Sequence, residues 1–336
     1  MRRLWGGLAA VVLLASAAPL AAAELNIYSE RHYQTDEQLY EGFTAATGIT
    51  LNRIEGKGDE LIERIKSEGA NSPADVLITV DVGRLWRADE AGLFQPIESK
   101  ALDAAIPASL RHPDGHWFGF SKRARLIYYN KDTVQAGDVN DYEDLADPKW
   151  KGKVCIRSGS NIYNLSLLGS LIEAHGEDGA TDWAKGVVAN FARDPQGGDT
   201  DQLRGVAAGE CVLAVANSYY FARLLANPEE KAVTDKIGWL FPNQDGRGSH
   251  VNISGAGVLA NAPHREEAVK FLEYLASEDA QRYFADGNNE YPVVKGVAPN
   301  STVQQLGDFK ADEINVASYG ENQPLAQKIF DRAGWK

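Results

Sequence analysis

Phenol and imidazole side chains occur at three places where an expected β-strand leads into an expected helix. His32 and Tyr33 follow the first such strand, Tyr163 follows a turn-rich segment, and Tyr219 and Tyr220 open a helix. Ligands of open α/β sheets bind beyond the carboxyl ends of the strands, so we expect these five side chains to share one pocket. Four phenols and one imidazole favour a hard trivalent cation. The sequence therefore predicts one Fe³⁺ ion as the cargo.

The charge of these side chains also favours a trivalent ion. Each phenol is expected near a helix N-terminus, whose partial positive charge stabilises an anion. A free tyrosine has a pKa of about 10, and a bound cation in this field can lower it far enough for phenolates to form at neutral pH. Four phenolates and a neutral imidazole carry four negative charges, of which Fe³⁺ neutralises three and a divalent ion only two.

Arginines near these segments are candidates to offset the remaining negative charge. Arg223 is the best of them because it lies on the helix that the tyrosine pair opens. Arg31, Arg123 and Arg125 are further candidates. We expect Arg223 and Arg123 to support the ligands without binding the metal themselves.

Each of these signals has a simpler explanation when it is taken alone. Two adjacent tyrosines most often pack in a core, as we expect for Tyr128 and Tyr129, and a single loop histidine usually lies at the surface. Only the coincidence of three strand-to-helix junctions favours a binding site.

Other candidate motifs predict ordinary structure. His112 and His116 have the spacing of metal ligands, but Pro113 and Gly115 lie between them, so we expect a turn in a solvated loop. Asp81 follows an expected strand, and we expect it to cap a helix or lie in a loop. The chain has no G-x-S-x-G, H-E-x-x-H or phosphate-loop motif. Because no nucleophile, base and orienting group form a recognisable set, we expect no enzyme.

Strand-like and helix-like runs alternate along the chain, which predicts an α/β fold with mixed sheets flanked by helices. Thr35 and Gln38 form an expected capping box for the first helix, and Gly48 is a natural stop. Asn217 or Ser218 is the expected cap of the helix that carries the tyrosine pair. The expected strands cover 25–29, 49–54, 75–80, 153–157 and 211–216, and the expected helices cover 35–47, 59–68, 83–91, 164–174 and 219–226. Two extended runs, 118–129 and 251–259, are expected to cross between lobes.

The first 23 residues have the pattern of a secretory signal peptide. Arg2 and Arg3 precede a largely apolar run, and Ala21–Ala23 provide a small-residue cleavage site. Cleavage removes two positive charges, so the net charge falls from −13 to −15, and it leaves 313 of the 336 residues. An acidic, exported protein is a poor partner for nucleic acid or anionic lipid. Its length favours two lobes.

The sequence contains two cysteines, Cys155 and Cys211. In an oxidising compartment two cysteines most often form one disulfide, and a thiolate metal site would need more ligands nearby. Both are expected on strands of the same lobe. The sequence therefore predicts a structural Cys155–Cys211 bridge.

At these residues the chain resembles the periplasmic ferric-ion-binding proteins of ABC importers, in the class II solute-binding superfamily that also includes the transferrins. The resemblance spans nearly all of the mature chain. Several short segments carry this resemblance when they are taken together. They are residues 27–29 (ahead of His32), 47–49, 73–76, 89–93, 148–153, 217–220, 254–256 and 290–292.

The resemblance implies two α/β lobes, joined by a hinge, that close on one Fe³⁺ ion held by His32 and the paired tyrosines. Where many members have a glutamate ligand after the third strand, this chain has Val80. Tyr33 and Tyr163 instead match a tyrosine-rich branch of the family, and five protein ligands leave little need for a synergistic anion. We expect an N-lobe of 24–122 plus about 253–285, and a C-lobe of 123–252 plus about 286–336.

The sequence thus predicts a monomeric periplasmic protein that delivers Fe³⁺ to an inner-membrane ABC permease and is not anchored in the membrane. An alternative keeps the fold but changes the cargo to an organic anion, a polyamine or a phosphonate. In that alternative the aromatic side chains stack on the solute and the arginines pair with its acid groups.

Overall fold

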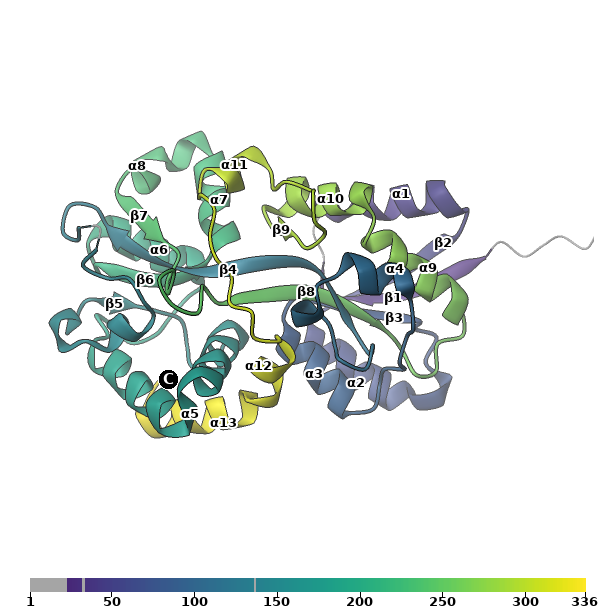
Figure 1. Cartoon of the computed structure of the whole chain (residues 1–336), viewed down its shortest axis with the longest axis horizontal. Helices are drawn as coiled ribbons and strands as arrows, with labels where there is room; N and C mark the ends of the chain where they lie inside the picture. Colours follow the sequence, from purple (N-terminus) through teal and green to yellow (C-terminus); the bar gives the residue numbers. More distant parts are fainter. Residues whose placement is uncertain (1–22, 32–33, 136) are drawn as a thin grey trace, which may run out of the picture.

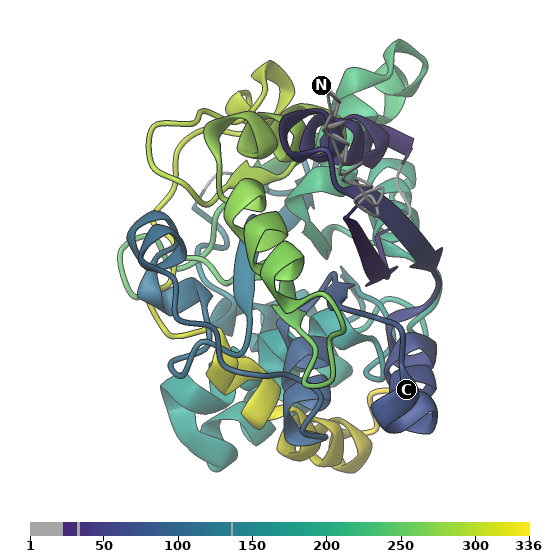
Figure 2. The same cartoon turned by 90° about the vertical axis from the view of Figure 1, so that its right-hand side faces the viewer.

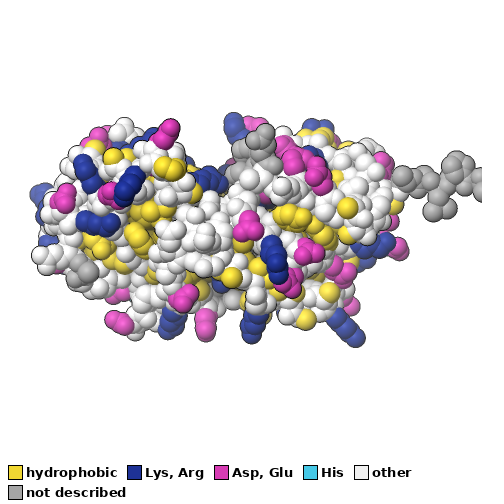
Figure 3. Space-filling model, turned by 90° about the horizontal axis from the view of Figure 1, so that it is seen from above, with side chains coloured by type: hydrophobic (Ala, Val, Ile, Leu, Met, Phe, Trp, Pro, Cys, Tyr) yellow, Lys and Arg dark blue, Asp and Glu magenta, His cyan; other side chains and the backbone are white. Residues whose placement is uncertain are grey.

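The computed structural model describes residues 23–31, 34–135 and 137–336, and these form two halves that lie side by side (Figure 1). The long strand β4 (Phe118–Asn130) runs from one half into the other, with β8 (Val251–Val258) beside it (Figure 1). Seen from above, a hollow separates the two halves, and basic side chains lie beside it (Figure 3).

The strands form a mixed sheet, as the sequence predicts. The other strands are β1 (Glu24–Ser29), β2 (Thr50–Glu55), β3 (Val76–Thr79), β5 (Val154–Cys155), β6 (Leu213–Asn217), β7 (Ile237–Leu240) and β9 (Tyr291–Pro292). Their order is β2-β1-β3-β8-β4-β6-β5, and β7 and β9 also pair with β4. β1 is parallel to β2 and β3, and β5 is parallel to β6, whereas β4 is antiparallel to its neighbours.

β4 belongs to both halves because it changes neighbours along its length. Residues 118–124 pair with β8, whereas residues 125–130 pair with β6 and β7. The long strand expected over 118–129 is thus confirmed. The change of neighbours lies close to the expected lobe boundary at 122 and 123, and the full division into lobes stays a prediction.

Helices pack on the sheet in both halves (Figure 1). The described α-helices are α1 (Glu37–Thr47), α2 (Gly58–Glu68), α3 (Val82–Glu90), α4 (Lys100–Ala105), α5 (Ile162–Ala189), α6 (Asp199–Ala208), α7 (Ser218–Ala226), α8 (Lys231–Thr234), α9 (Arg265–Leu275), α10 (Glu278–Asn288), α11 (Ser301–Gln304), α12 (Ala317–Glu321) and α13 (Gln323–Ala333). Figure 2 shows the green helices α9 and α10 next to the dark α1. The rings of Phe43 on α1 and Phe271 on α9 meet edge to face, with centroids 5.1 Å apart. None of the described helices is long and apolar enough to cross a membrane.

The first helix ends as predicted but begins differently. Gly48 has φ 72° and donates its N–H to the carbonyl of Thr44, which stops α1. The expected capping box is wrong, because Asp36 is the N-cap residue and makes no side-chain capping bond. A short 3₁₀ turn precedes the helix. The hydroxyl of Thr35 instead donates to the amide oxygen of Asn288 on α10, 3.1 Å away.

α5 begins two residues earlier than predicted and continues past the predicted end. The side chain of Asn161 accepts a hydrogen bond from the N–H of Tyr163 at 3.1 Å and so caps the helix. Gly176, at the predicted end, has φ 71° and ψ 179°, which kinks the helix instead of terminating it. The glycine signal therefore marks a real break, after which a second helical stretch follows.

β5 is shorter than the strand expected over 153–157. The carbonyls of Arg157 and Ser158 accept hydrogen bonds from the side-chain amide of Asn164, at 2.9 and 3.0 Å. These carbonyls are therefore used by a loop rather than by a neighbouring strand. The loop leads directly to the first turn of α5.

The Cys155–Cys211 disulfide is confirmed. Cys155 lies on β5, and Cys211 lies just before β6, the parallel neighbour of β5. The pairing of these strands brings the two Cα atoms to 5.8 Å, a separation that a disulfide spans readily.

Replacing both cysteines with alanine should destabilise the protein. The bridge joins residues 56 positions apart, and closing a loop of this length lowers the entropy of the unfolded chain. We expect the free energy of unfolding, measured by urea denaturation, to fall by roughly 2–4 kcal/mol. The unbridged wild type, denatured in the presence of a reductant, is the matched control and should show the same loss. Equal stability of oxidised wild type and variant would contradict a structural role.

Candidate functional site

Three of the tyrosines predicted as ligands lie together at the N-termini of α5 and α7. Tyr163 is in the first turn of α5, and Tyr219 and Tyr220 are in the first turn of α7. The hydroxyl of Tyr219 donates a hydrogen bond to the phenol oxygen of Tyr163 at 3.2 Å. The rings of Tyr219 and Tyr220 have centroids 4.4 Å apart. His32 and Tyr33 lie outside the described residues, and the role of all five as ligands stays a prediction.

The parallel pairing of β5 and β6 explains why these tyrosines meet. Cys155 on β5 stands opposite Ala214 on β6. Because parallel neighbours end at the same edge of a sheet, the chain leaves both strands on the same side. α5 follows β5 through a short loop, and α7 follows β6 without any gap. Residues in the first turns of the two helices are therefore brought to one place.

Three arginine side chains surround Tyr163. The guanidinium carbons of Arg123, Arg125 and Arg157 lie 5.9, 5.9 and 5.2 Å from the centroid of its ring. Arg123 and Arg125 are fully buried, whereas Arg157 is partly exposed. Sequence reasoning missed Arg157, although it stands at the end of an expected strand just ahead of the Tyr163 loop.

Arg223 lies beside the tyrosine pair, as its place on α7 predicts. Its guanidinium carbon is 5.1 Å from the ring centroid of Tyr219 and 5.8 Å from that of Tyr220. A cation over the face of an aromatic ring is attracted to it. The same positive charge would stabilise a phenolate in the unprotonated form.

Buried hydrogen bonds fix the position of Arg125. Its Nη1 donates to Asp199 at 3.2 Å and to the side chain of Asn217 at 2.9 Å, and its Nη2 donates to Asn164 at 2.7 Å. Asp199 also faces Arg157 at 3.5 Å and accepts the backbone N–H of Asn217 at 2.8 Å. Asp199 is fully buried and was missed from the sequence, where the only signal is its place after two glycines at the start of α6.

This network explains one departure from the expected helix caps. Asn217 is the N-cap residue of α7, but its side chain makes no capping bond. Its amide oxygen accepts from Arg125 instead. A buried guanidinium group requires hydrogen-bond acceptors. The amide oxygen of Asn217 therefore accepts from Arg125 instead of capping the N-terminus of α7.

Arg123 reaches from β4 toward the other half of the molecule. Its Nη2 donates to the backbone carbonyl of Val80 and lies 3.8 Å from the carboxylate of Asp81. Asp81 in turn accepts from the hydroxyl of Ser166 on α5 at 2.7 Å and from the side chain of Asn252 on β8 at 3.0 Å. Buried polar contacts thus connect the end of β3 with α5.

Asp81 also has the capping role that the sequence predicts. Its carboxylate accepts the backbone N–H of Gly83 at 2.9 Å, at the N-terminus of α3. The expectation of a helix cap is confirmed. The contacts to Ser166 and Asn252 go beyond it, since they involve residues far away in the sequence.

The pKa of the Tyr163 phenol is raised well above its usual value. Burial is the largest cause, and the nearby Tyr220 adds to it, whereas Arg123 and the hydrogen bond from Tyr219 act in the opposite direction. Tyr163 is therefore a neutral phenol at physiological pH. A cation must displace the proton before this oxygen can bind as a phenolate.

Arg123 and Arg157 keep their charge in spite of their burial. Burial alone would lower the pKa of Arg123, but Asp81 and other anionic partners raise it above its usual value. Burial is also the largest single effect on Arg157 and lowers its pKa, but Asp199, Tyr220 and Tyr163 together raise the pKa above its usual value. The positive charges of these arginines therefore favour the deprotonation of the nearby phenols when a metal binds.

Val80 occupies the position after β3, and a carboxylate lies next to it. The backbone N–H of Val80 donates to Glu30 at 3.1 Å, and Arg84 pairs with the same carboxylate at 3.1 Å. Burial raises the pKa of Glu30, against the effect of Arg84. Sequence reasoning missed Glu30, which immediately follows β1.

Arg31 is held in place just ahead of the two undescribed residues. It pairs with Asp36 at 2.9 Å and with Glu290 at 2.9 Å, and all three side chains are buried. Ser121 on β4 also donates to Glu290, at 2.9 Å. These contacts anchor the chain where it leaves β1.

Comparisons with known proteins agree with this architecture. Residues 38–311 match the family described as bacterial extracellular solute-binding protein. The chain is 57% identical over 315 residues to iron uptake protein A1 of Synechocystis sp., covering 93% of this chain and 88% of that protein. A solved structure of a Trichodesmium FutA (IdiA) protein in complex with iron and citrate has a TM-score of 0.91 at 60% identity, covering 94% of this chain and all of that one. A ferric binding protein from Campylobacter jejuni has a TM-score of 0.86 at 43% identity, covering 93% and 100%.

These structural neighbours are two-lobed periplasmic binding proteins with the same mixed α/β architecture, so the predicted fold class and the resemblance stated from the sequence are confirmed. Members of this group bind and transport a ligand and are not enzymes. They work together with ABC permeases. The chain belongs to the family of bacterial extracellular solute-binding proteins.

Proposed function

We propose that this protein captures one ferric ion between its two halves in the periplasm and delivers it, as a monomer, to an inner-membrane ABC permease. In this proposal residues 1–23 direct export and are removed. The observation that carries it is the convergence of Tyr163, Tyr219 and Tyr220 beside four arginines. The relatives named for iron support it. These relatives, at 43–60% identity, favour iron over a small organic solute as the cargo, whereas a relative named for 2-aminoethylphosphonate is 25% identical.

The spacing of the phenol oxygens suits one small cation. Tyr163 and Tyr219 have their oxygens 3.2 Å apart. An octahedral ion with ligand distances of about 2.0–2.1 Å separates neighbouring ligand atoms by roughly 2.9 Å. A small shift of either side chain therefore allows both oxygens to contact the same ion once their hydrogen-bond proton has been lost.

The surrounding arginines stabilise the loaded site. Four phenolates and an imidazole leave one negative charge after Fe³⁺ binds, and Arg123, Arg157 and Arg223 lie close enough to offset it. They donate no lone pair and so remain outside the coordination sphere. Their effect is to favour the phenolate form of the ligands.

Closure of the two halves would complete the site. His32 and Tyr33 follow β1 in the sequence, and β1 belongs to the half opposite to Tyr163, Tyr219 and Tyr220 (Figure 1). An ion that binds to ligands from both halves has a higher affinity for the closed form, and this difference drives closure. The hydrogen bond of 2.7 Å between Asp81, which follows β3, and Ser166 on α5 supports this step, because it joins the two halves directly.

Titration of the metal-stripped mature protein with ferric citrate should produce a visible absorption band. Phenolate bound to Fe³⁺ gives an orange-red charge-transfer band, which we expect to saturate at one equivalent. Tyr219→Phe or Tyr220→Phe should weaken or abolish the band because each removes a ligand. Tyr129→Phe is the matched control and should leave it unchanged, because Tyr129 stands opposite Leu213, at the end of β6 that is remote from Tyr219. A protein that never develops the band would refute the proposal.

Arg157→Gln should weaken iron binding without unfolding the protein. The substitution removes a partly exposed cation 5.2 Å from the Tyr163 ring, so the net negative complex loses stabilisation. We expect the apparent affinity to fall roughly tenfold, corresponding to ~1.4 kcal/mol, and the pH of half-release to rise. The sign follows because phenols with a higher pKa compete for protons up to a higher pH.

Competition with a chelator, followed through the same band across a pH series, measures both effects. Arg332→Gln is the control, since Arg332 pairs with Glu177 in a half-exposed salt bridge on α13. An Arg157→Gln protein with unchanged affinity and unchanged pH of half-release would show that Arg157 does not stabilise the ligands.

A further inference from the structure

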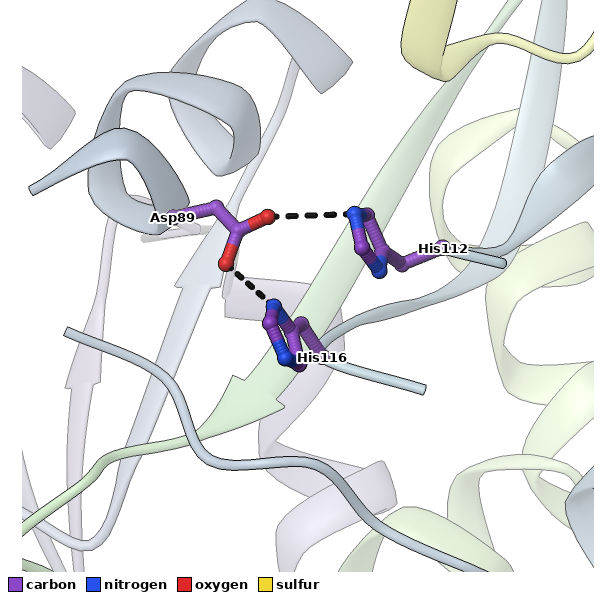
Figure 4. A group of neighbouring side chains, drawn as sticks. All are labelled: Asp89, His112 and His116. Atoms are coloured by element: carbon purple, nitrogen blue, oxygen red, sulfur yellow. Dashed lines mark hydrogen bonds and ion pairs between the residues drawn. The ribbon is translucent and has the colours of Figure 1, made fainter. Parts of the chain in front are cut away.

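A second group of metal-ligand side chains lies outside the tyrosine site. Asp89 is near the C-terminal end of α3, and His112 and His116 lie in the loop ahead of β4. Figure 4 shows both imidazole rings facing the same carboxylate. Nε2 of His112 is 3.2 Å from one oxygen of Asp89, and Nδ1 of His116 is 2.6 Å from the other. One potential ligand atom from each residue lies within 4.8 Å of the others.

The loop holds the two histidines in a fixed arrangement. Their rings are nearly parallel, with an interplanar angle of 2° and centroids 4.6 Å apart. The N–H of His112 donates to the carbonyl of Trp117 at 2.9 Å, and the N–H of Gly115 donates to the carbonyl of His112 at 3.1 Å. Gly115 has φ 75°, which favours glycine at this turn. The expected turn is therefore present, but it directs both rings toward α3 instead of into solvent.

We propose that Asp89, His112 and His116 bind one divalent transition-metal ion, with Zn²⁺ as the best match, at a site separate from the tyrosine cleft. Two imidazole nitrogens and one carboxylate oxygen form a ligand set that Zn²⁺ uses, with a fourth position open to water. The set carries one negative charge and includes borderline nitrogen donors, so it suits a divalent ion better than hard Fe³⁺.

The simpler explanation is that the two histidines only donate hydrogen bonds to Asp89. Nδ1 of His112 accepts the backbone N–H of Asp114 at 3.1 Å, so without metal the ring hydrogen is on Nε2, facing the carboxylate. Metal binding moves that hydrogen to Nδ1 and leaves the Asp114 N–H to water. Asp114 is exposed, so water can replace the lost acceptor at small cost. Hydrogen bonding and metal binding are thus alternative states of one preformed group.

The position of the group separates it from the cleft. Asp81 is at the N-terminal end of α3, and Asp89 is eight residues further, which corresponds to about 12 Å along a helix. The side chain of Asn315, just ahead of α12, donates to the carbonyl of Arg111 at 3.3 Å. A metal at this group would therefore connect α3 to a loop that also contacts the C-terminal part of the chain.

Isothermal titration calorimetry with Zn²⁺ tests the site, using mature, chelator-treated protein without a histidine tag. We expect one equivalent to bind with a micromolar dissociation constant and to raise the melting temperature. His112→Gln and His116→Gln should each weaken binding by at least about tenfold, and Asp89→Asn should weaken it as well. His175→Ala is the matched control, because His175 is a partly exposed histidine that faces Glu143 at 2.7 Å.

Two further measurements keep the result independent of the iron site and of folding. Tyr219→Phe protein should give the same Zn²⁺ isotherm, so a failure of the ferric proposal would leave this one standing. If a histidine variant does not fold, Co²⁺ added to the wild type decides, since nitrogen ligation at a four-coordinate site gives an intense visible spectrum. No saturable Zn²⁺ binding up to about 1 mM, or equal binding by wild type and the folded histidine variants, would overturn the proposal.

Discussion

The arrangement of the tyrosine site depends on the burial of one guanidinium group, that of Arg125. Its charge lies where β4 changes neighbours, with 1% of its surface exposed. Asp199, Asn164 and Asn217 supply its acceptors, and they come from α6, α5 and the end of β6. An unmatched buried charge costs several kcal/mol, so these three elements must meet around it. The tyrosines stand next to Asn164 and close to Asn217 in the sequence and are therefore placed by the same constraint.

Arg123 extends this constraint to the other half of the molecule. It is two residues before Arg125 on β4, so both side chains project from the same face of the strand. Arg125 is matched within its own half, whereas Arg123 contacts Val80 and Asp81 at the end of β3. The two neighbouring cations thus connect a single strand to both sides of the cleft. A change in the angle between the halves must rearrange the partners of Arg123 while those of Arg125 stay in place.

The sequence predicts the features that are decided locally and misses those that depend on distant contacts. The junctions that lead into the helices of Tyr163 and Tyr219 and the stop at Gly48 follow from nearby residues and are observed. The Cys155–Cys211 bridge joins distant residues and was predictable because the chain has two cysteines. The capping box fails because Thr35 bonds to Asn288, 253 positions away. Asp199 and Arg157 also escape detection, since a carboxylate at a helix start and a strand-end arginine are common alone. Likewise, the spacing of the two loop histidines says nothing about the carboxylate on α3 that they face.

In the proposed iron site, proton competition would allow the tyrosine cluster to select cations by charge. Burial keeps Tyr163 protonated, although the hydrogen bond that its oxygen accepts from Tyr219 favours the phenolate. A cation must therefore displace several protons at once, and each displacement becomes easier as the charge of the cation increases. The arginines reduce this cost because they favour phenolates, but they also repel any cation that fails to form them. The arginines would repel a divalent ion, and its charge would be too small to neutralise the phenolates. A trivalent ion attracts the phenolates more strongly and so offsets both the loss of the protons and the repulsion by the arginines. The imidazole pair beside Asp89 presents no comparable barrier, because an imidazole nitrogen can bind a metal when the ring hydrogen moves to the other nitrogen.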